Sequence, residues 1–439
     1  MSDVFRLRER GSSPARELIA GVTTFGAMSY VIAVNPAIMA PTGIDQRVLI
    51  EATALASMLA TLIMALWANL PIALAPGMGS NVIFAQVVVA RLGVPYPTAL
   101  TMVLIGACLF LLLAATRLRE RIVLGFPESL RIGMQCAIGL LIAYIGLANS
   151  GLLAHRGGQP AFAGLDTPAA FLAFAGLLVT PALVALRVPA ALLVSIAGLT
   201  VAGLFLQDPQ GIPLTRLPDR LLEAPSFPGE IFLHFDPRDF FTRLPVLLPI
   251  TLYFFLSDFF SATATLVGVT RLGGLATSDG GIPNAQRAYA ADGLASILGA
   301  ALGMPTIVAY VESAAGVEAG GRTGLASLVT AALFGVAMFL WPLISAIPPL
   351  ATAPALVLVG LMMLQGVRHI DFSRPEDAVP PLLTMVVTVV TTDLMMALVS
   401  GALSYSLIVA ATRQWRKLTP AMLAIDAVLL VYTGVAQSL

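Results

Sequence analysis

Long stretches without a charged side chain are the feature of this sequence that most limits its fold. No Asp, Glu, Lys or Arg occurs in residues 18–44, 52–90, 92–116 or 323–367. Because a helix of about 20 apolar residues spans the hydrocarbon core of a bilayer, each stretch is long enough for one or two spans. Hydrophobic residues make up 58% of the 439 residues and charged residues only 11%, whereas soluble domains carry roughly 25% charged residues. The sequence therefore predicts an all-α polytopic protein embedded in a lipid bilayer.

The apolar segments predict about fourteen transmembrane spans in two sets of seven. We divide the chain into an N-terminal tail (1–16), a first repeat (17–206), a connecting loop (207–242), a second repeat (243–412) and a C-terminal apolar segment (413–439). The spans are expected near 17–40, 49–70, 74–91, 97–116, 131–150, 167–186, 188–206, 243–270, 285–303, 305–319, 323–346, 351–367, 378–394 and 396–412. A further apolar stretch at 419–437 is compatible with another helix, whose depth in the membrane stays open.

Arginine residues in the short loops predict the orientation of the chain. Loops rich in Lys and Arg face the cytoplasm, and here such loops occur at the start and after even-numbered spans. This distribution predicts a cytoplasmic N-terminus, and the tail lacks the apolar core and cleavage site of a signal peptide. The residues concerned are Arg6, Arg8, Arg10, Arg16, Arg117, Arg119, Arg121, Arg271, Arg368 and Arg374.

Spans three and ten are poor helices and occupy matching places in the two halves. Pro76, Gly77 and Gly79 precede Asn81 in span three, and Gly303 and Pro305 precede Glu312 in span ten. Seven spans followed by seven more predict an inverted repeat, because a unit with an odd number of spans changes orientation when duplicated. Paired interrupted spans point to a transporter binding site. We expect extended pieces at about 72–76 and 306–310, each followed by a half-helix.

Four polar residues near these interruptions are candidates for binding a ligand. Glu312 lies where the second extended piece becomes helix, and Asp258 lies within span eight. An acid at the bilayer centre costs about 2.5–3.5 kcal/mol, so each is expected to bind a polar ligand or hold a proton, the alternative being a structural cap. Asn81 offers a donor and an acceptor or caps a half-helix. Ser261 places a hydroxyl one turn after Asp258 or bonds back to its own helix.

The remaining polar residues suggest structural roles and no enzyme. Glu318 and Arg322 are expected in a loop or salt bridge, Asp393 as a helix cap, and Asp279 and Asp292 as loop and helix-end residues. Neither HExxH nor the phosphate-binding GxxxxGK[ST] occurs, so a zinc protease or an ATP-driven pump is not indicated. The two cysteines show no metal spacing, so no metal or cofactor is expected. The formal net charge of zero argues against nucleic acid as a partner.

Four blocks of the sequence resemble a known transporter family. They are GVTTFGAMSYVIAVNPAIMA (21–40), APGMGSNVIFA (75–85), DFFSATATLVGV (258–269) and ESAAGVEAGGRTGL (312–325). These blocks resemble the AzgA-type hypoxanthine/guanine/adenine permeases of the nucleobase–ascorbate (xanthine/uracil) permease superfamily. The resemblance extends over nearly all spans.

The resemblance implies a fold, a function and roles for individual residues. Spans 1–4 and 8–11 would form a core domain, and spans 5–7 and 12–14 a gate domain, with alternating access between them. The protein would import a purine nucleobase by proton symport across an inner membrane, and a homodimer is compatible with the family. Glu312 matches the span-ten glutamate that contacts the base, Asn81 the polar residue of span three, and Asp258 the first acid of the span-eight motif.

The sequence departs from the family pattern at the span-eight motif. Relatives carry D-L-F-D-T-L-G-T there, whereas this chain has Ser261 at the second acid and Ala264 at the glycine position. One possible proton carrier or base-reading group is therefore replaced by a hydroxyl. Our hypothesis is that one of Glu312 and Asp258 reads the base while the other carries or responds to the proton. A carrier of the same architecture for xanthine, uracil or a small anion is the alternative, although two acids at the site disfavour an anion.

Overall fold

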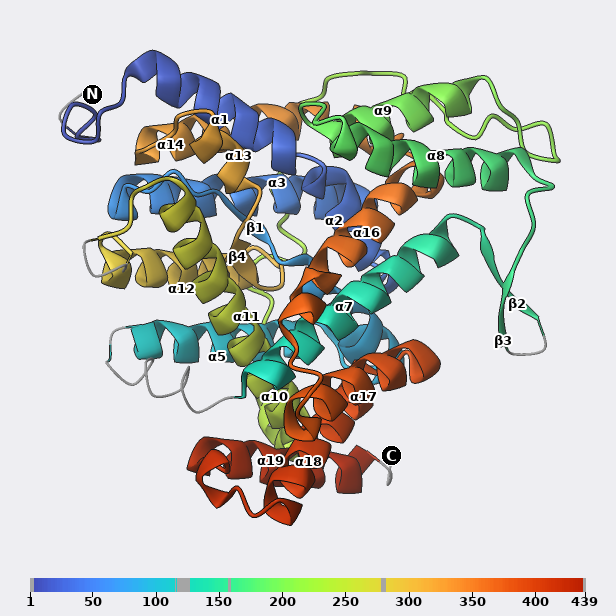
Figure 1. The fold of residues 1–439 in the computed structure, drawn as a ribbon. Helices are drawn as coiled ribbons and strands as arrows, with labels where there is room; N and C mark the ends of the chain where they lie inside the picture. Colours follow the sequence, from blue (N-terminus) through green and yellow to red (C-terminus); the bar gives the residue numbers. More distant parts are fainter. Residues whose placement is uncertain (1–3, 115, 117–126, 157–158, 278–281, 437–439) are drawn as a thin grey trace.

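The computed structural model describes residues 4–114, 116, 127–156, 159–277 and 282–436 (Figure 1). Arg117, Arg119, Arg121 and Asp279 lie outside this range. The first half contains the helices α1 (Pro14–Met28), α2 (Val31–Met39), α3 (Gln46–Ile63), α4 (Met78–Val82), α5 (Tyr96–Ala114), α7 (Glu128–Asn149), α8 (Pro168–Ala185) and α9 (Ala191–Leu204). The second half contains α10 (Pro237–Thr242), α11 (Leu244–Leu272), α12 (Ala285–Ala301), α13 (Ser313–Glu318), α14 (Gly324–Ala337), α15 (Trp341–Ser345), α16 (Pro349–Met363), α17 (Pro375–Thr391), α18 (Leu394–Ala411) and α19 (Pro420–Ala436).

Short helical turns and four strands complete the described structure. Two π-helical segments, η2 (Met64–Ala68) and η3 (Ile83–Arg91), flank the first interruption. The 3-10 turns are η1 (Ala40–Thr42), η4 (Met338–Leu340), η5 (Leu364–His369) and η6 (Trp415–Lys417). The strands are β1 (Leu74–Pro76), β2 (Leu153–Arg156), β3 (Gln159–Phe162) and β4 (Ile307–Ala309).

The helices agree with the spans that the sequence predicts. Nine helical stretches of the described residues are long and apolar enough to cross a membrane, and Met78–Arg91 and Ala191–Leu204 are shorter apolar helices. The stretch at 419–437 is mostly helical as α19, which packs on α11 and α18. The fold class is confirmed, and the total of fourteen spans stays a prediction.

The two interrupted segments meet as a pair of strands near the middle of the molecule (Figure 1). β1 and β4 pair antiparallel, with Leu74 opposite Ala309 and Pro76 opposite Ile307. The extended pieces that were expected at 72–76 and 306–310 are thus confirmed. Antiparallel pairing of equivalent strands is the geometry that an inverted repeat produces.

Hydroxyl side chains form hydrogen bonds with the backbone groups at the outer edges of this two-stranded sheet. Thr61 of α3 bonds both the N–H and the C=O of Leu74, each at 2.9 Å. Ser296 of α12 does the same for Ile307, at 3.2 and 2.6 Å. Because a lipid core supplies no water to unpaired backbone groups, these two hydroxyls allow the chain to be extended at this depth.

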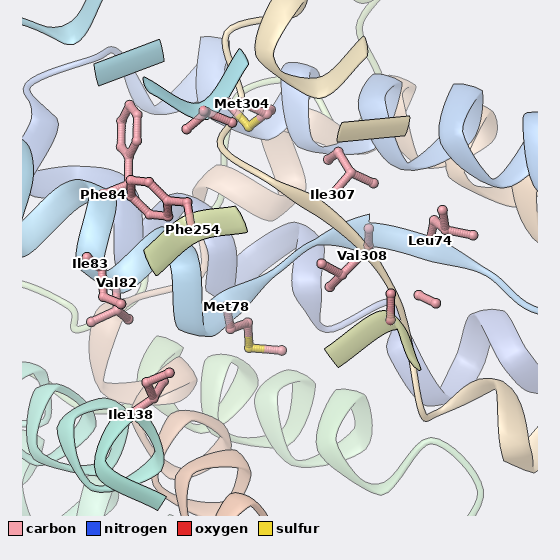
Figure 2. Close-up of a cluster of buried hydrophobic side chains, with 14 of the residues drawn as sticks. Leu74, Met78, Val82, Ile83, Phe84, Ile138, Phe254, Met304, Ile307 and Val308 are labelled. Atoms are coloured by element: carbon pink, nitrogen blue, oxygen red, sulfur yellow. The ribbon is translucent and has the colours of Figure 1, made fainter. Parts of the chain in front are cut away.

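Apolar side chains enclose the crossing of the two strands. Figure 2 shows Leu74, Ile307 and Val308 of the strands among residues of α4, α7 and α11. Most of these residues are buried in the largest hydrophobic cluster of the described chain. The polar candidates described below are therefore held by a packed apolar core, which fixes their positions.

The helices pack as two groups. The first packing group consists of α1, α2, α3, α4, η3, α5, α11, α12, α13 and α14, and the second consists of α7, α8, α9, α16, α17 and α18. In the second group, Gly139 and Gly360 bring α7 and α16 together so closely that a Cβ on either would overlap the backbone of the other. Small residues permit such close helix approach in membranes. Contacts between the groups include α4 with α7 and α2 with α16.

Candidate functional site

Glu312 lies at the start of α13, directly after β4 and its following turn. Its Oε1 accepts a hydrogen bond of 2.6 Å from the hydroxyl of Tyr30, the buried residue between α1 and α2. The Glu312 side chain is half-buried and its neighbour Val311 is 57% exposed. The carboxylate thus lies beside the crossing strands, where a helix N-terminus also favours negative charge.

Asp258 and Ser261 occupy adjoining positions on α11. Asp258 is buried, its Oδ1 has no hydrogen-bond partner among the described residues, and Thr306, just before β4, lies near its carboxylate. Ser261 lies one turn further along and is exposed, as is Ala264. This side of α11 therefore presents an acid next to β4 and a hydroxyl toward open space.

Asp292 is a buried acid inside a helix, and its assignment as a helix-end residue was wrong. It lies in the middle of α12, and its Oδ1 accepts a hydrogen bond of 3.0 Å from the N–H of Ala309 in β4. Its Oδ2 is buried without a partner in the described part of the chain. Asp292 also lies close enough to Asp258 to interact with it electrostatically. The two acids therefore flank the same three-residue strand.

Asn81 lies on α4 and is completely buried. Its side-chain N–H donates to Oδ1 of Asn35 on α2, and Asn35 in turn donates to Thr53 at 2.8 Å. The Asn81 Oδ1 has no partner within the described ranges. The structure thus places Asn81 in an amide network behind β1, and no hydrogen bond between described residues joins it to Glu312 or Asp258.

The other polar predictions can also be compared with the structure. Asp393 caps α18, as expected, by accepting from the N–H groups of Met395 and Met396 at 3.0 Å each. Glu318 ends α13, and the guanidinium of Arg322 donates to the carbonyl of Val317 at 2.7 Å.

Comparison with known sequences identifies the family. A family model described as "Permease family" (Xan_ur_permease) matches residues 15–400. The chain belongs to this permease family. It is therefore a multi-pass membrane transporter and not an enzyme.

Curated relatives match the permease over nearly its whole length. It is 35% identical over 428 residues to "Guanine/hypoxanthine permease PbuO" of Bacillus subtilis, with 95% of this chain and 96% of the relative covered. It is 34% identical over 429 residues to "Adenine permease AdeQ" of Escherichia coli, with 97% and 94% covered.

Solved structures of other transporters share the fold of the permease. The transmembrane domain of the cyanobacterial bicarbonate transporter BicA superposes with a TM-score of 0.64 at 17% identity, covering 88% of this chain and 96% of that one. The murine anion transporter Slc26a9 in its inward-facing state gives a TM-score of 0.61 at 12% identity, covering 91% and 68%. The permease shares the architecture of these proteins, which supports the core-and-gate inverted repeat.

Sequence reasoning missed three residues of this site in the permease. They are Asp292, Thr306 as a neighbour of Asp258, and Tyr30 as the hydrogen-bond partner of Glu312. Asp292 could have been found, because it lies well inside the predicted span 285–303, where an acid indicates function by default. Tyr30 carries no such signal, since an aromatic residue in an apolar span is usually part of the core.

Proposed function

We propose that this permease imports purine nucleobases, namely hypoxanthine, guanine or adenine. The observation that carries the proposal is the identity of about a third of the residues, over nearly the full length, with relatives named as guanine/hypoxanthine and adenine permeases. The half-buried Glu312 beside the crossing strands supplies a group that suits such a ligand.

The base binds beside the strand crossing, with Glu312 as its main polar contact. A purine is flat and neutral and carries N–H donors on its edges, so a carboxylate can accept two of them at once. Such charge-assisted hydrogen bonds are the strong ones. Tyr30 holds one oxygen of Glu312 at 2.6 Å and so fixes the carboxylate before the ligand arrives. Ser261, on the exposed side of α11, adds a hydroxyl contact, and Asn81 supports the first half of the site from behind β1.

Transport is coupled to protons through the acids next to β4. Asp258 and Asp292 are buried near each other, and no ion pair between described residues neutralises either of them. Burying two charges without a counter-ion is costly, which favours a proton on the pair at some stage of the cycle. Glu312 is the base-reading acid in this scheme, and Asp258 responds to the proton.

The two packing groups move against each other as core and gate. The core comprises spans 1–4 and 8–11 and the gate spans 5–7 and 12–14, with the division at the bounds expected from the sequence. The arginine distribution supports a cytoplasmic N-terminus in an inner membrane. The family resemblance alone supports a homodimer that pairs through the gate.

Uptake of labelled hypoxanthine by cells or proteoliposomes tests the proposal. We expect saturable uptake that a pH gradient (acidic outside) accelerates and that guanine and adenine compete, while xanthine, uracil, sulfate and bicarbonate do not. Uptake of an anion without any purine uptake would overturn the proposal. Uptake of hypoxanthine at the same rate with and without the pH gradient would reject only the proton coupling. The Ser261→Asp variant then shows whether a second acid on α11 restores a dependence on the gradient.

A further inference from the structure

A cavity of about 620 Å³ lies between the two packing groups and apart from the strand crossing. Its first-group wall includes Ala33 and Ala37 of α2 and Gln86 of η3, and its second-group wall includes Asn149 of α7 and Thr352 of α16. Neither Glu312, Asp258 nor Ser261 lines it. Ligand sites in proteins are typically clefts of roughly 300–1,000 Å³, so this cavity is large enough for a small heterocycle.

The cavity opens on the membrane face opposite the N-terminus. α1 and α2 together form one span, and the turn at 40–46 that follows them contributes Ala40, Pro41, Ile44 and Gln46 to the lining. Ala33 lies one turn after Tyr30, the residue that bonds Glu312.

Six polar side chains line this cavity, and two of them, Ser345 and Thr352, donate to backbone carbonyls three residues earlier. Gln46, Gln86, Asn149 and Arg216 have no side-chain hydrogen bond or ion pair to another described residue, and Gln86 is only partly exposed. Pro36, Leu49, Ile347 and Pro348 provide flat apolar walls between them. Convergent free amides in an apolar cleft are what a ligand with several donors and acceptors requires.

The connecting loop holds Arg216 over the cavity by anchors on both packing groups. Just before Arg216, the N–H of Thr215 donates to Gly203 of α9 at 3.0 Å. After it, Ser226 donates to the buried Glu51 of α3 at 2.6 Å, and Glu223 pairs with Arg47 at 3.4 Å. Arg216 is therefore part of a loop fixed at two ends, which limits how far it can swing away.

We propose that this cavity is a second binding site for the purine, where a base is captured before it reaches the strand crossing. The proposal rests on the proposed function. Arginine pairs bidentately with the O6/N7 edge of guanine, and glutamine with the N6/N7 edge of adenine, so Arg216 and Gln86 match the edges of a purine. The apolar walls cover its faces. The central site accepts from the N–H donors of the base, whereas Arg216 in this cavity donates to its acceptors and the Gln86 amide can do both.

Thiol protection in nanodiscs tests the second site, because nanodiscs leave both faces accessible. The reporter is Ala37→Cys in a background that carries Cys108→Ser, Cys136→Ser and Glu312→Gln, so that binding at the strand crossing is weakened by up to roughly a hundredfold. We expect hypoxanthine to slow maleimide labelling of this cysteine. Adding Gln86→Leu or Arg216→Gln should raise the protecting concentration roughly tenfold, about the effect of one lost hydrogen bond. The matched control Arg220→Gln, an exposed residue of the same loop outside the cavity lining, should leave it unchanged.

The outcomes separate the second site from the proposed function. Absence of protection in the Glu312→Gln background, while the unmodified permease takes up hypoxanthine, would overturn the second site and leave purine import standing. A protecting concentration that is unchanged in Gln86→Leu and in Arg216→Gln would also overturn it. Absence of hypoxanthine uptake by the unmodified permease would reject the proposed function itself, and the second site with it.

Discussion

Buried carboxylates at the rim of the molecule differ from those at its centre. Glu17 of α1 is fully buried, and its two oxygens accept from the backbone N–H groups of Arg322, Thr323 and Ala326 at 2.9–3.3 Å. At the centre, by contrast, Asp258 and Asp292 each keep one buried oxygen without a partner in the part of the chain that the structure describes.

This difference separates acids that hold the fold together from acids that are free to act. A buried polar atom without a partner costs about 1–3 kcal/mol, so each one calls for a reason, and a functional role is one such reason. Both oxygens of Glu17 are bonded to N–H groups at the start of α14, so neither is available to a ligand. Asp258 and Asp292 retain bonding capacity for a proton or a polar ligand. Substitutions at the rim should therefore change stability, and those at the centre should change transport.

The largest effect is expected for Glu312→Gln. The amide keeps the shape of the side chain but loses the charge and one acceptor, and hydrogen bonds to charged groups are worth about 1.5–3 kcal/mol, or up to roughly a hundredfold in affinity. Hypoxanthine uptake should fall by about that factor while the amount of membrane-inserted protein stays the same.

Two further variants make the Glu312 test specific. Glu318→Gln changes the exposed acid at the other end of α13, and uptake should stay normal. Tyr30→Phe removes only the hydroxyl that orients Glu312, so its loss of uptake should be smaller than that of Glu312→Gln. Normal uptake by Glu312→Gln would remove Glu312 from the site.

Asp292→Asn should reduce uptake by roughly tenfold, as expected for one lost interaction of a charged group. Its amide oxygen can still accept from the N–H of Ala309, so β4 should remain in place. The measurement is the rate of uptake with and without a pH gradient, together with thermal unfolding of the purified protein. An unchanged response to the gradient in both Asp292→Asn and Asp258→Asn would contradict proton coupling at this pair.

The fold could be predicted from the sequence because the lipid environment constrains it so strongly. Charge-free stretches indicate helices, and paired Pro and Gly interruptions indicated β1 and β4 within a few residues. The antiparallel pair of β2 and β3 was not expected, because it lies in a loop between spans, where the pattern of apolar residues does not predict secondary structure.

The candidate site could be predicted only in part. Glu312 and Asp258 were found because a charge inside a span is rare. Their neighbours Tyr30 and Thr306 come from distant spans, and no local pattern shows which helices pack together. Asn81 was expected beside the acids but bonds Asn35 instead, because α2 packs against α4.

At the rim, Glu17→Gln should lower stability without changing the affinity for the base. The amide replaces one of the two accepting oxygens by a donor that faces backbone N–H groups, which should cost about 1 kcal/mol. A lower midpoint of thermal unfolding in nanodiscs, with an unchanged half-saturating concentration for uptake, is the expected result. A changed half-saturating concentration at normal stability would contradict the assignment of Glu17 to stability alone.

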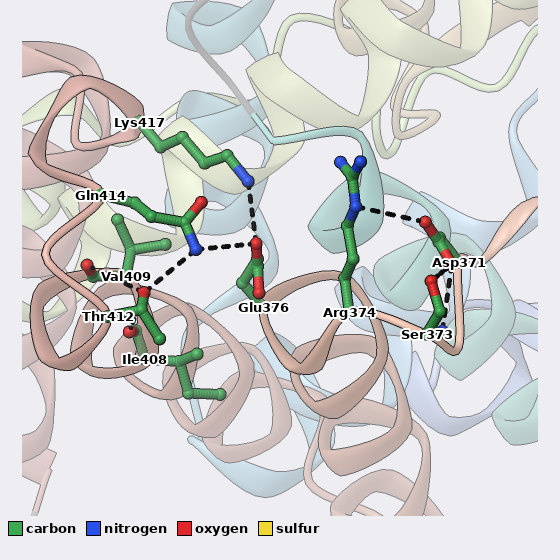
Figure 3. A network of polar contacts seen from close by, with 9 residues as sticks. All are labelled: Asp371, Ser373, Arg374, Glu376, Ile408, Val409, Thr412, Gln414 and Lys417. Atoms are coloured by element: carbon green, nitrogen blue, oxygen red, sulfur yellow. Dashed lines mark hydrogen bonds and ion pairs between the residues drawn. The ribbon is translucent and has the colours of Figure 1, made fainter.

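The smallest effect is expected at Glu376, in the first turn of α17 and outside the predicted span 378–394. Lys417 and Gln414 each donate to its Oε1 at 2.9 Å (Figure 3), and the Lys417 ammonium is the main reason why the pKa of Glu376 is lowered from 4.5 to about 2. A lowered pKa in the folded state means that this carboxylate stabilises the fold fully above about pH 4.5, and that the contribution is lost as the pH falls toward 2. The unfolding midpoint of the unmodified protein should therefore decrease between pH 5 and pH 3 by more than that of Glu376→Gln, which has no carboxylate to titrate there. Because Lys417 precedes α19, equal decreases in both proteins would mean that this contact does not hold α19 in place, and that the rim owes its stability to backbone-bonded acids such as Glu17 alone.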